Sequence, residues 1–221
     1  DISFAPVLDL DDSRSSIIGD RAIGDNPEEV IDIASAFIKG MNQAGMKATG
    51  KHFPGHGGIY ADSHLTFSQD TRSLSELEDH DLLPFDALKS QLGAIMTAHI
   101  SFSNIDKEIA TFSKFWLQDI LRNKLGFSGT IFSDDLSMKG ADYIGGIEAK
   151  VGKALESGCT MVLVCNDRPA ALKAINFLEK EKISQSQKAT KLKASQSIIW
   201  ADLEKDTRRK DIIDKLNIIG K

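Results

Sequence analysis

The sequence has few of the features that define several large classes of protein. Its 221 residues include only two cysteines, Cys159 and Cys165, which lie six positions apart within one apolar run. Two such residues do not provide the framework of a disulfide-stapled domain. They indicate small buried side chains in a reducing compartment. We therefore expect a cytoplasmic protein.

Long apolar runs and a strong charge of one sign are also missing. No apolar stretch reaches the roughly 18 residues of a transmembrane helix. The opening DISFAPVLDL has no charged segment before an apolar core, so it does not predict a signal peptide. Lys and Arg number 27 against 32 Asp and Glu, giving a net charge of -5 and no basic surface. We expect neither a membrane nor a nucleic acid as partner.

What is present is an alternation of strand-like and helix-like segments. Strands are predicted over residues 2–10, 46–53, 93–100, 129–134 and 159–166. Helices are predicted from Pro27 to about Gly45, over 75–91 with Pro84 as a break or restart, and over 113–125, 146–157 and 168–179. Strands that are each followed by a helix predict a parallel sheet with right-handed crossovers.

Polar side chains stand at the ends of the predicted strands. They are Asp9, Lys51 with His52, His99, Asp134 and Asn166. Ligands of parallel α/β folds bind at the carboxyl ends of strands. The predicted fold class is therefore α/β, a (β/α)8 TIM barrel of which about the last five βα units are present.

An incomplete barrel has consequences for domains and partners. Residues 1–180 are predicted to be the C-terminal part of a TIM-barrel catalytic domain, and 181–221 a C-terminal helical extension. About three units would be missing at the N-terminus. Since five units leave two strand edges and an apolar interior open, we expect self-association through the open edge.

The stretch KHFPGHGGIYADSH, residues 51–64, allows three interpretations. A phosphate-binding loop is disfavoured because the glycine patterns of such loops are absent. A metal site has enough candidate ligands, although neither HxH nor HExxH occurs. These candidates are His52, His56, Asp62, His64 and His99. A third interpretation is proton transfer, since Asp62 and His64 point the same way in an extended segment and a carboxylate raises the pKa of an imidazole.

The third interpretation needs a nucleophile, and SDDLSM at 133–138 offers one. Asp134 and Asp135 both qualify. If Phe132 points into the barrel, then Asp134 does too and Asp135 points away. Alternation alone does not say which face is inward. Asp135 is also expected to cap the helix that follows.

Together with IFSDDLSM, the KHFPGHGGIYADSH stretch closely resembles glycoside hydrolase family 3, and within it the β-N-acetylglucosaminidase branch. The likeness extends from DISFAPVLDL through IGDRAI, GAIMTAHI and GCTMVLVCN. It covers roughly the first 165 residues. The resemblance implies a retaining exo-hydrolase that removes terminal N-acetylglucosamine from muropeptides in cell-wall recycling, with no metal and no cofactor.

The resemblance also implies roles for individual residues. Asp134, the first aspartate of the SDD motif, would be the nucleophile. His64 would be the acid/base, paired with Asp62. The substrate-binding residues would be Arg21, Lys51 and His52.

Two alternatives to the hydrolase remain open. A phosphorylase of the same family would pass the sugar to phosphate, which a histidine acid/base does not repel. A catalytically incomplete fragment would need a partner chain, since family members begin with further βα units. Activity is therefore expected of the intact protein rather than of these 221 residues alone.

Overall fold

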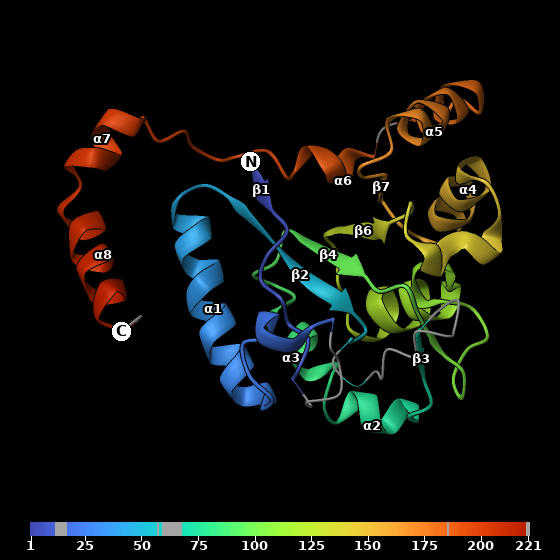
Figure 1. Cartoon of the computed structure of the whole chain (residues 1–221), viewed down its shortest axis with the longest axis horizontal. Coiled ribbons are helices and arrows are strands. Elements are labelled where there is room, and N and C mark those ends of the chain that lie inside the picture. Colours follow the sequence, from blue (N-terminus) through green and yellow to red (C-terminus); the bar gives the residue numbers. More distant parts are fainter. Residues whose placement is uncertain (12–16, 57, 59–67, 185, 220–221) are drawn as a thin grey trace.

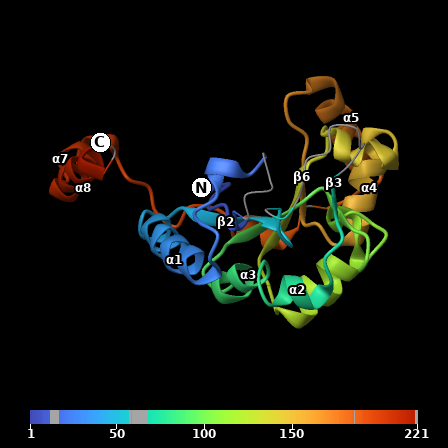
Figure 2. The ribbon, with the colours of Figure 1, turned by 60° about the horizontal axis from the view of Figure 1, so that its bottom comes forward.

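A computed structural model describes residues 1–11, 17–56, 58, 68–184 and 186–219. Its main feature is a five-stranded parallel sheet in the order β1-β2-β4-β6-β7. The strands are β1 (Ile2–Ser3), β2 (Lys47–Phe53), β4 (Ala94–Thr97), β6 (Thr130–Asp135) and β7 (Met161–Leu163). The sheet curls into a half-barrel with helices packed around it (Figure 2). The predicted α/β class and its five parallel strands are confirmed.

Helices connect the strands as the periodicity predicts (Figure 1). The longer ones are α1 (Pro27–Gln43), η3 (Phe115–Lys124, a wider π-type helix), α4 (Ile147–Ser157) and α5 (Arg168–Lys180). The shorter ones are η1 (Gly19–Arg21), α2 (Leu74–Glu78), α3 (Leu83–Leu88), η2 (Ala110–Phe112) and η4 (Lys139–Ile144). Asn26 caps α1 by accepting the N–H groups of Glu28 and Glu29. Gly45, with φ +79°, supports the turn after α1.

The predicted strand over 2–10 is much shorter in the structure. Only β1 forms a ladder, because Pro6 has no N–H to donate. The segment still follows β2, since Thr49 donates to the Ala5 carbonyl and Val7 bridges to Lys51. This path carries Asp9 to the end of β2.

Two other predicted elements are divided. GAIMTAHI forms β4 and then, from Ile100, the strand β5 (Ile100–Phe102). β5 pairs with β3 (Ser68–Asp70) in a separate two-stranded sheet. The helix predicted over 75–91 is split into α2 and α3, and Pro84 lies in the first turn of α3, where its missing N–H costs nothing. His99 therefore lies between two sheets rather than inside one strand.

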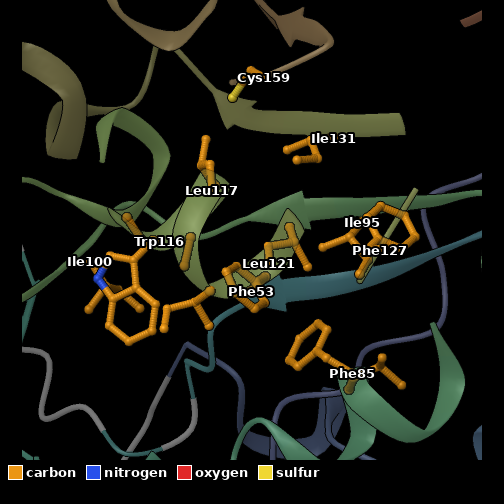
Figure 3. Packing of buried hydrophobic residues seen from close by; sticks show 14 of the residues in the cluster. Phe53, Phe85, Ile95, Ile100, Trp116, Leu117, Leu121, Phe127, Ile131 and Cys159 are labelled. Atoms are coloured by element: carbon orange, nitrogen blue, oxygen red, sulfur yellow. The ribbon is translucent and has the colours of Figure 1, made fainter. Parts of the chain in front are cut away.

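The sheet separates two apolar clusters. Between the sheet and the helices, Phe53 contacts Phe85 and Trp116 edge-to-face, with ring centroids 5.5 and 6.2 Å apart (Figure 3). The opposite, concave face carries a smaller cluster that includes Met96 and Phe132. Since strand side chains alternate, Asp134 lies on the same face as Phe132.

The C-terminal segment contains α6 (Gln187–Thr190), α7 (Trp200–Lys205) and α8 (Thr207–Ile219). α7 and α8 lie to one side of the sheet, beyond α1, at the end of an extended stretch (Figures 1 and 2). The division into 1–180 and 181–221 stays a prediction. Within the described ranges, no helix has both the length and the apolar character needed to cross a membrane.

Candidate active site

Charged residues from three separate segments gather at the carboxyl end of the sheet. Lys51 lies two residues before the end of β2, Asp134 lies one residue before the end of β6, and Arg21 comes from η1. Burial and the positive charge of Arg21 lower the pKa of Lys51, while the negative charges of Asp134 and Asp9 act in the opposite direction. Arg21, Asp134 and Asp9 therefore each lie within electrostatic reach of Lys51.

His52 is held more tightly than a surface histidine. Its side chain is 8% exposed, and its Nδ1 lies 2.7 Å from Oδ2 of Asp9. Its backbone N–H donates to Oδ1 of the same carboxylate over 3.0 Å. The β2–β4 ladder passes from Lys51 directly to Phe53, so His52 has no partner on β4. The peptide bond between Lys51 and His52 is cis.

His56 is buried beside His52. Its ring meets the His52 ring edge-on, with centroids 5.7 Å apart. Burial lowers the pKa of His56, although the negative charge of Asp9 opposes this. Its Nδ1 is buried and has no hydrogen-bond partner in the described structure. Burial without a hydrogen-bond partner at Nδ1 favours the neutral form of the His56 imidazole.

His99 supports the segment behind the candidate nucleophile. Its Nε2 lies 3.0 Å from the Asp135 carbonyl, which can only accept, so Nε2 carries a proton. Its Nδ1 lies 2.9 Å from the hydroxyl of Thr111. Burial lowers the pKa of His99, while the charge of Asp134 acts the other way. Both ring nitrogens have protein partners, as expected of a wall residue.

The two adjacent aspartates have different surroundings. The carboxylate of Asp135 accepts the N–H groups of Ser137 and Cys165, each over 2.9 Å. It therefore joins the loops after β6 and β7. The expectation that Asp135 caps a helix is wrong, because the next helical segment begins at Lys139 without a side-chain cap. Asp134 accepts the N–H of Asp135 over 2.8 Å.

Asp62 and His64 fall outside the described residues, so their predicted roles stay predictions. The same holds for a metal site that includes them. Among the residues that the structure does describe, no three potential ligands from His, Cys, Asp and Glu converge. Arg21, Lys51, His52 and Asp134 are brought together as described above.

Sequence reasoning missed the connection between Asp9 and His52. Asp9 was recognised as a polar strand end, but nothing in the sequence pairs it with a residue 43 positions away. The hydroxyl of Thr111 was missed too, because it lies in a segment without strand or loop signals. One signal was available: Asp9 follows a predicted strand, and the carboxyl ends of parallel strands meet at the same edge of the sheet, where β2 also ends.

Fold and site together define a class: an α/β-barrel domain with its charged groups at the carboxyl ends of the strands. The model of the family described as "Glycosyl hydrolase family 3 N terminal domain" matches residues 1–196, and the chain belongs to this family. The predicted family is thereby confirmed.

Named relatives agree with this assignment. The chain is 48% identical to a beta-hexosaminidase of Tolumonas auensis over 99% of its own length and 65% of the relative's. A beta-hexosaminidase of Pseudomonas aeruginosa is 49% identical over 87% of the chain and 58% of the relative. The chain thus spans less than two thirds of these relatives.

Solved structures show the same architecture. Native NagZ from Neisseria gonorrhoeae has a TM-score of 0.79 at 42% identity, covering 89% of this chain and 57% of that one. A glycoside hydrolase family 3 beta-N-acetylglucosaminidase from Paenibacillus has a TM-score of 0.77 at 30% identity. That match covers 86% of this chain and 38% of the other.

Proposed function

We propose that this chain is the greater part of the catalytic domain of a retaining exo-β-N-acetylglucosaminidase. Its substrate class is a muropeptide with a terminal N-acetylglucosamine, and it acts in cell-wall recycling in the cytoplasm. One observation carries the proposal: Lys51, near the carboxyl end of β2, lies within electrostatic reach of both Arg21 and Asp134. The names of the relatives support the same substrate class.

The proposed reaction has two displacements. First, a carboxylate oxygen of Asp134 attacks the anomeric carbon, and the bond from that carbon to the glycosidic oxygen breaks. The imidazolium of His64 gives its proton to the departing oxygen, with Asp62 as its partner. Then neutral His64 takes a proton from water, the water oxygen bonds to the anomeric carbon, and the Asp134 carboxylate leaves.

Three side chains have a simple role in this scheme. Lys51 and Arg21 bind hydroxyl and amide oxygens of the sugar, and His52 binds one of its hydroxyl or amide groups. A histidine as acid/base adds no second negative charge beside Asp134, unlike the second carboxylate of most retaining glycosidases.

The test uses the full-length protein and 4-nitrophenyl β-N-acetylglucosaminide. Asp134→Asn should lower kcat about a thousandfold or more, because a neutral amide replaces the nucleophilic carboxylate. Asp119→Asn is the matched control, since Asp119 is exposed on η3. Adding azide to Asp134→Gly should restore turnover and give the α-glycosyl azide. Wild-type rates in Asp134→Asn would sink the proposal.

Product analysis separates the neighbouring activities. Free N-acetylglucosamine as product, at a rate independent of added phosphate, indicates hydrolysis. A sugar 1-phosphate would indicate the phosphorylase instead. We also propose that the 221-residue chain self-associates through β7, whose outer edge pairs with no strand within the described ranges.

A further inference from the structure

Asp9 makes two hydrogen bonds to a single residue, His52. One carboxylate oxygen accepts the backbone N–H of His52 over 3.0 Å, and the other contacts its Nδ1 over 2.7 Å. Asp9 is 1% exposed. Its own backbone is fixed nearby, because Leu8 donates its N–H to the carbonyl of Lys51. The carboxylate of Asp9 is thus hydrogen-bonded to both the main chain and the ring of His52.

This geometry fixes where the proton of the ring lies. Burial would raise the pKa of Asp9, but the charge and the hydrogen bonds of His52, with the charge of His56, hold it below its ordinary value. An ionised carboxylate only accepts, so Nδ1 of His52 must be the donor. Nε2 is then the one ring nitrogen left for a ligand. Ring rotation is also restricted by the edge of His56.

We propose that Asp9 is a positioning residue for the sugar: it fixes the tautomer and ring orientation of His52, so that Nε2 is presented to a hydroxyl or amide group of N-acetylglucosamine. This inference rests on the proposed function. The bond to the backbone N–H fixes the main chain at His52, and the bond to Nδ1 fixes its ring. Such a partner on the far ring nitrogen is how proteins orient a histidine that binds a ligand through its other nitrogen.

The testing substitution is Asp9→Asn, which keeps the size of the side chain. The amide oxygen can still accept the backbone N–H of His52, but an NH2 group now faces Nδ1. Since NH2 only donates, the neutral imidazole must move its proton to Nε2. The variant therefore exchanges the tautomer of His52 without opening a cavity.

Two readouts follow, both on the full-length protein. At a pH at which the His52 ring is neutral, nitrogen-15 NMR should show the Nδ1–H tautomer in the wild type and the Nε2–H tautomer in Asp9→Asn. For 4-nitrophenyl β-N-acetylglucosaminide, KM should rise about tenfold or more, as expected for a lost charge-assisted interaction. kcat should change less, because Asp134 and His64 are untouched. Asp119→Asn should leave both readouts at wild-type values.

The inference is overturned if wild-type His52 is the Nε2–H tautomer, whatever the variants do. It is equally overturned if Asp9→Asn folds, changes the tautomer and keeps the wild-type KM. Titration with N-acetylglucosamine separates it from the proposed function. A wild type that shows the Nε2 resonance shift on sugar binding, yet does not cleave the substrate, refutes the hydrolase and supports the role of Asp9. A wild type without that shift refutes the role of Asp9.

Discussion

Arg72 forms ion pairs with two buried carboxylates, those of Asp70 and Asp81. Replacing Arg72 tests how much these ion pairs contribute to the stability of the fold. Its Nη1 lies 2.7 Å from Oδ2 of Asp81, and its Nη2 lies 2.7 Å from Oδ2 of Asp70. The two aspartates are 2% and 3% exposed. Asp81 also packs against the turn after β2, where a Cβ on Gly55 would lie 2.6 Å from its Oδ1. The guanidinium is therefore the main compensation for two buried charges.

Arg72→Met removes the charge and keeps an apolar stem of similar length. Breaking a buried ion pair from one side typically costs about 3–5 kcal/mol, because the remaining charge is left uncompensated. The Arg72 side chain is 21% exposed, so water screens part of the loss. We expect the free energy of unfolding at neutral pH to fall by about 3 kcal/mol, the lower end of that range.

The loss should depend on pH in a defined direction. Burial raises the pKa of Asp81 above its ordinary value, although Arg72 and His80 act against this. Without Arg72 the pKa of Asp81 rises further. The folded variant then holds a proton that the unfolded chain releases, so its stability falls as pH rises through that window. Lowering the pH toward the ordinary carboxyl pKa, about 4, should narrow the gap to the wild type.

Urea denaturation of both proteins at several pH values measures this gap. Arg72→Lys is the matched variant: it keeps the charge but lacks the planar fork, so an intermediate loss is expected. Adding Asp81→Asn to Arg72→Met should restore part of the stability, because one uncompensated charge disappears. A loss below about 1 kcal/mol, or one that stays constant with pH, would refute the reasoning.

Two further predictions concern the core and the open edge. Trp116→Ala should lower the free energy of unfolding by about 3–5 kcal/mol, and Trp116→Phe by about 1–2 kcal/mol. The loss is smaller for Phe because the buried indole N–H has no partner in the described structure, so little is lost with it. Urea unfolding of the two variants measures the difference, and equal losses would contradict the prediction. Size-exclusion chromatography with light scattering should give the 221-residue chain a mass above the 24.1 kDa of the monomer. The reason is that the outer edge of β7 is unpaired among the described strands. A monomeric mass at every concentration would rule out that association.

Much of the fold followed from local pattern. The apolar runs around β2, β4, β6 and β7 predict buried parallel strands, because both faces of such a sheet are covered. Asn26 and Pro27 together mark the start of α1, since a side-chain cap and a pre-set φ both favour helix initiation there. These signals lie within a few residues of the elements they specify.

Boundaries that depend on distant partners were not predictable in this way. The 93–100 run divides because β5 pairs with β3, whose position the sequence does not state. Likewise, the strand predicted over 2–10 depends on how far β2 can pair with it once Pro6 interrupts the ladder. Asp135 was expected to cap a helix, but the loop after β7 brought the N–H of Cys165 to it instead.

The sequence by itself determined the family, the parallel α/β order and the placing of ionisable groups at strand ends. These follow from periodicity and from motifs, which are local. Only the tertiary structure decided that Asp9 is hydrogen-bonded to His52, 43 residues away, and that Arg72 forms ion pairs with both Asp70 and Asp81. The physical reason is that a hydrogen bond is made or lost within a few tenths of an ångström, and only the folded backbone brings distant residues to that precision.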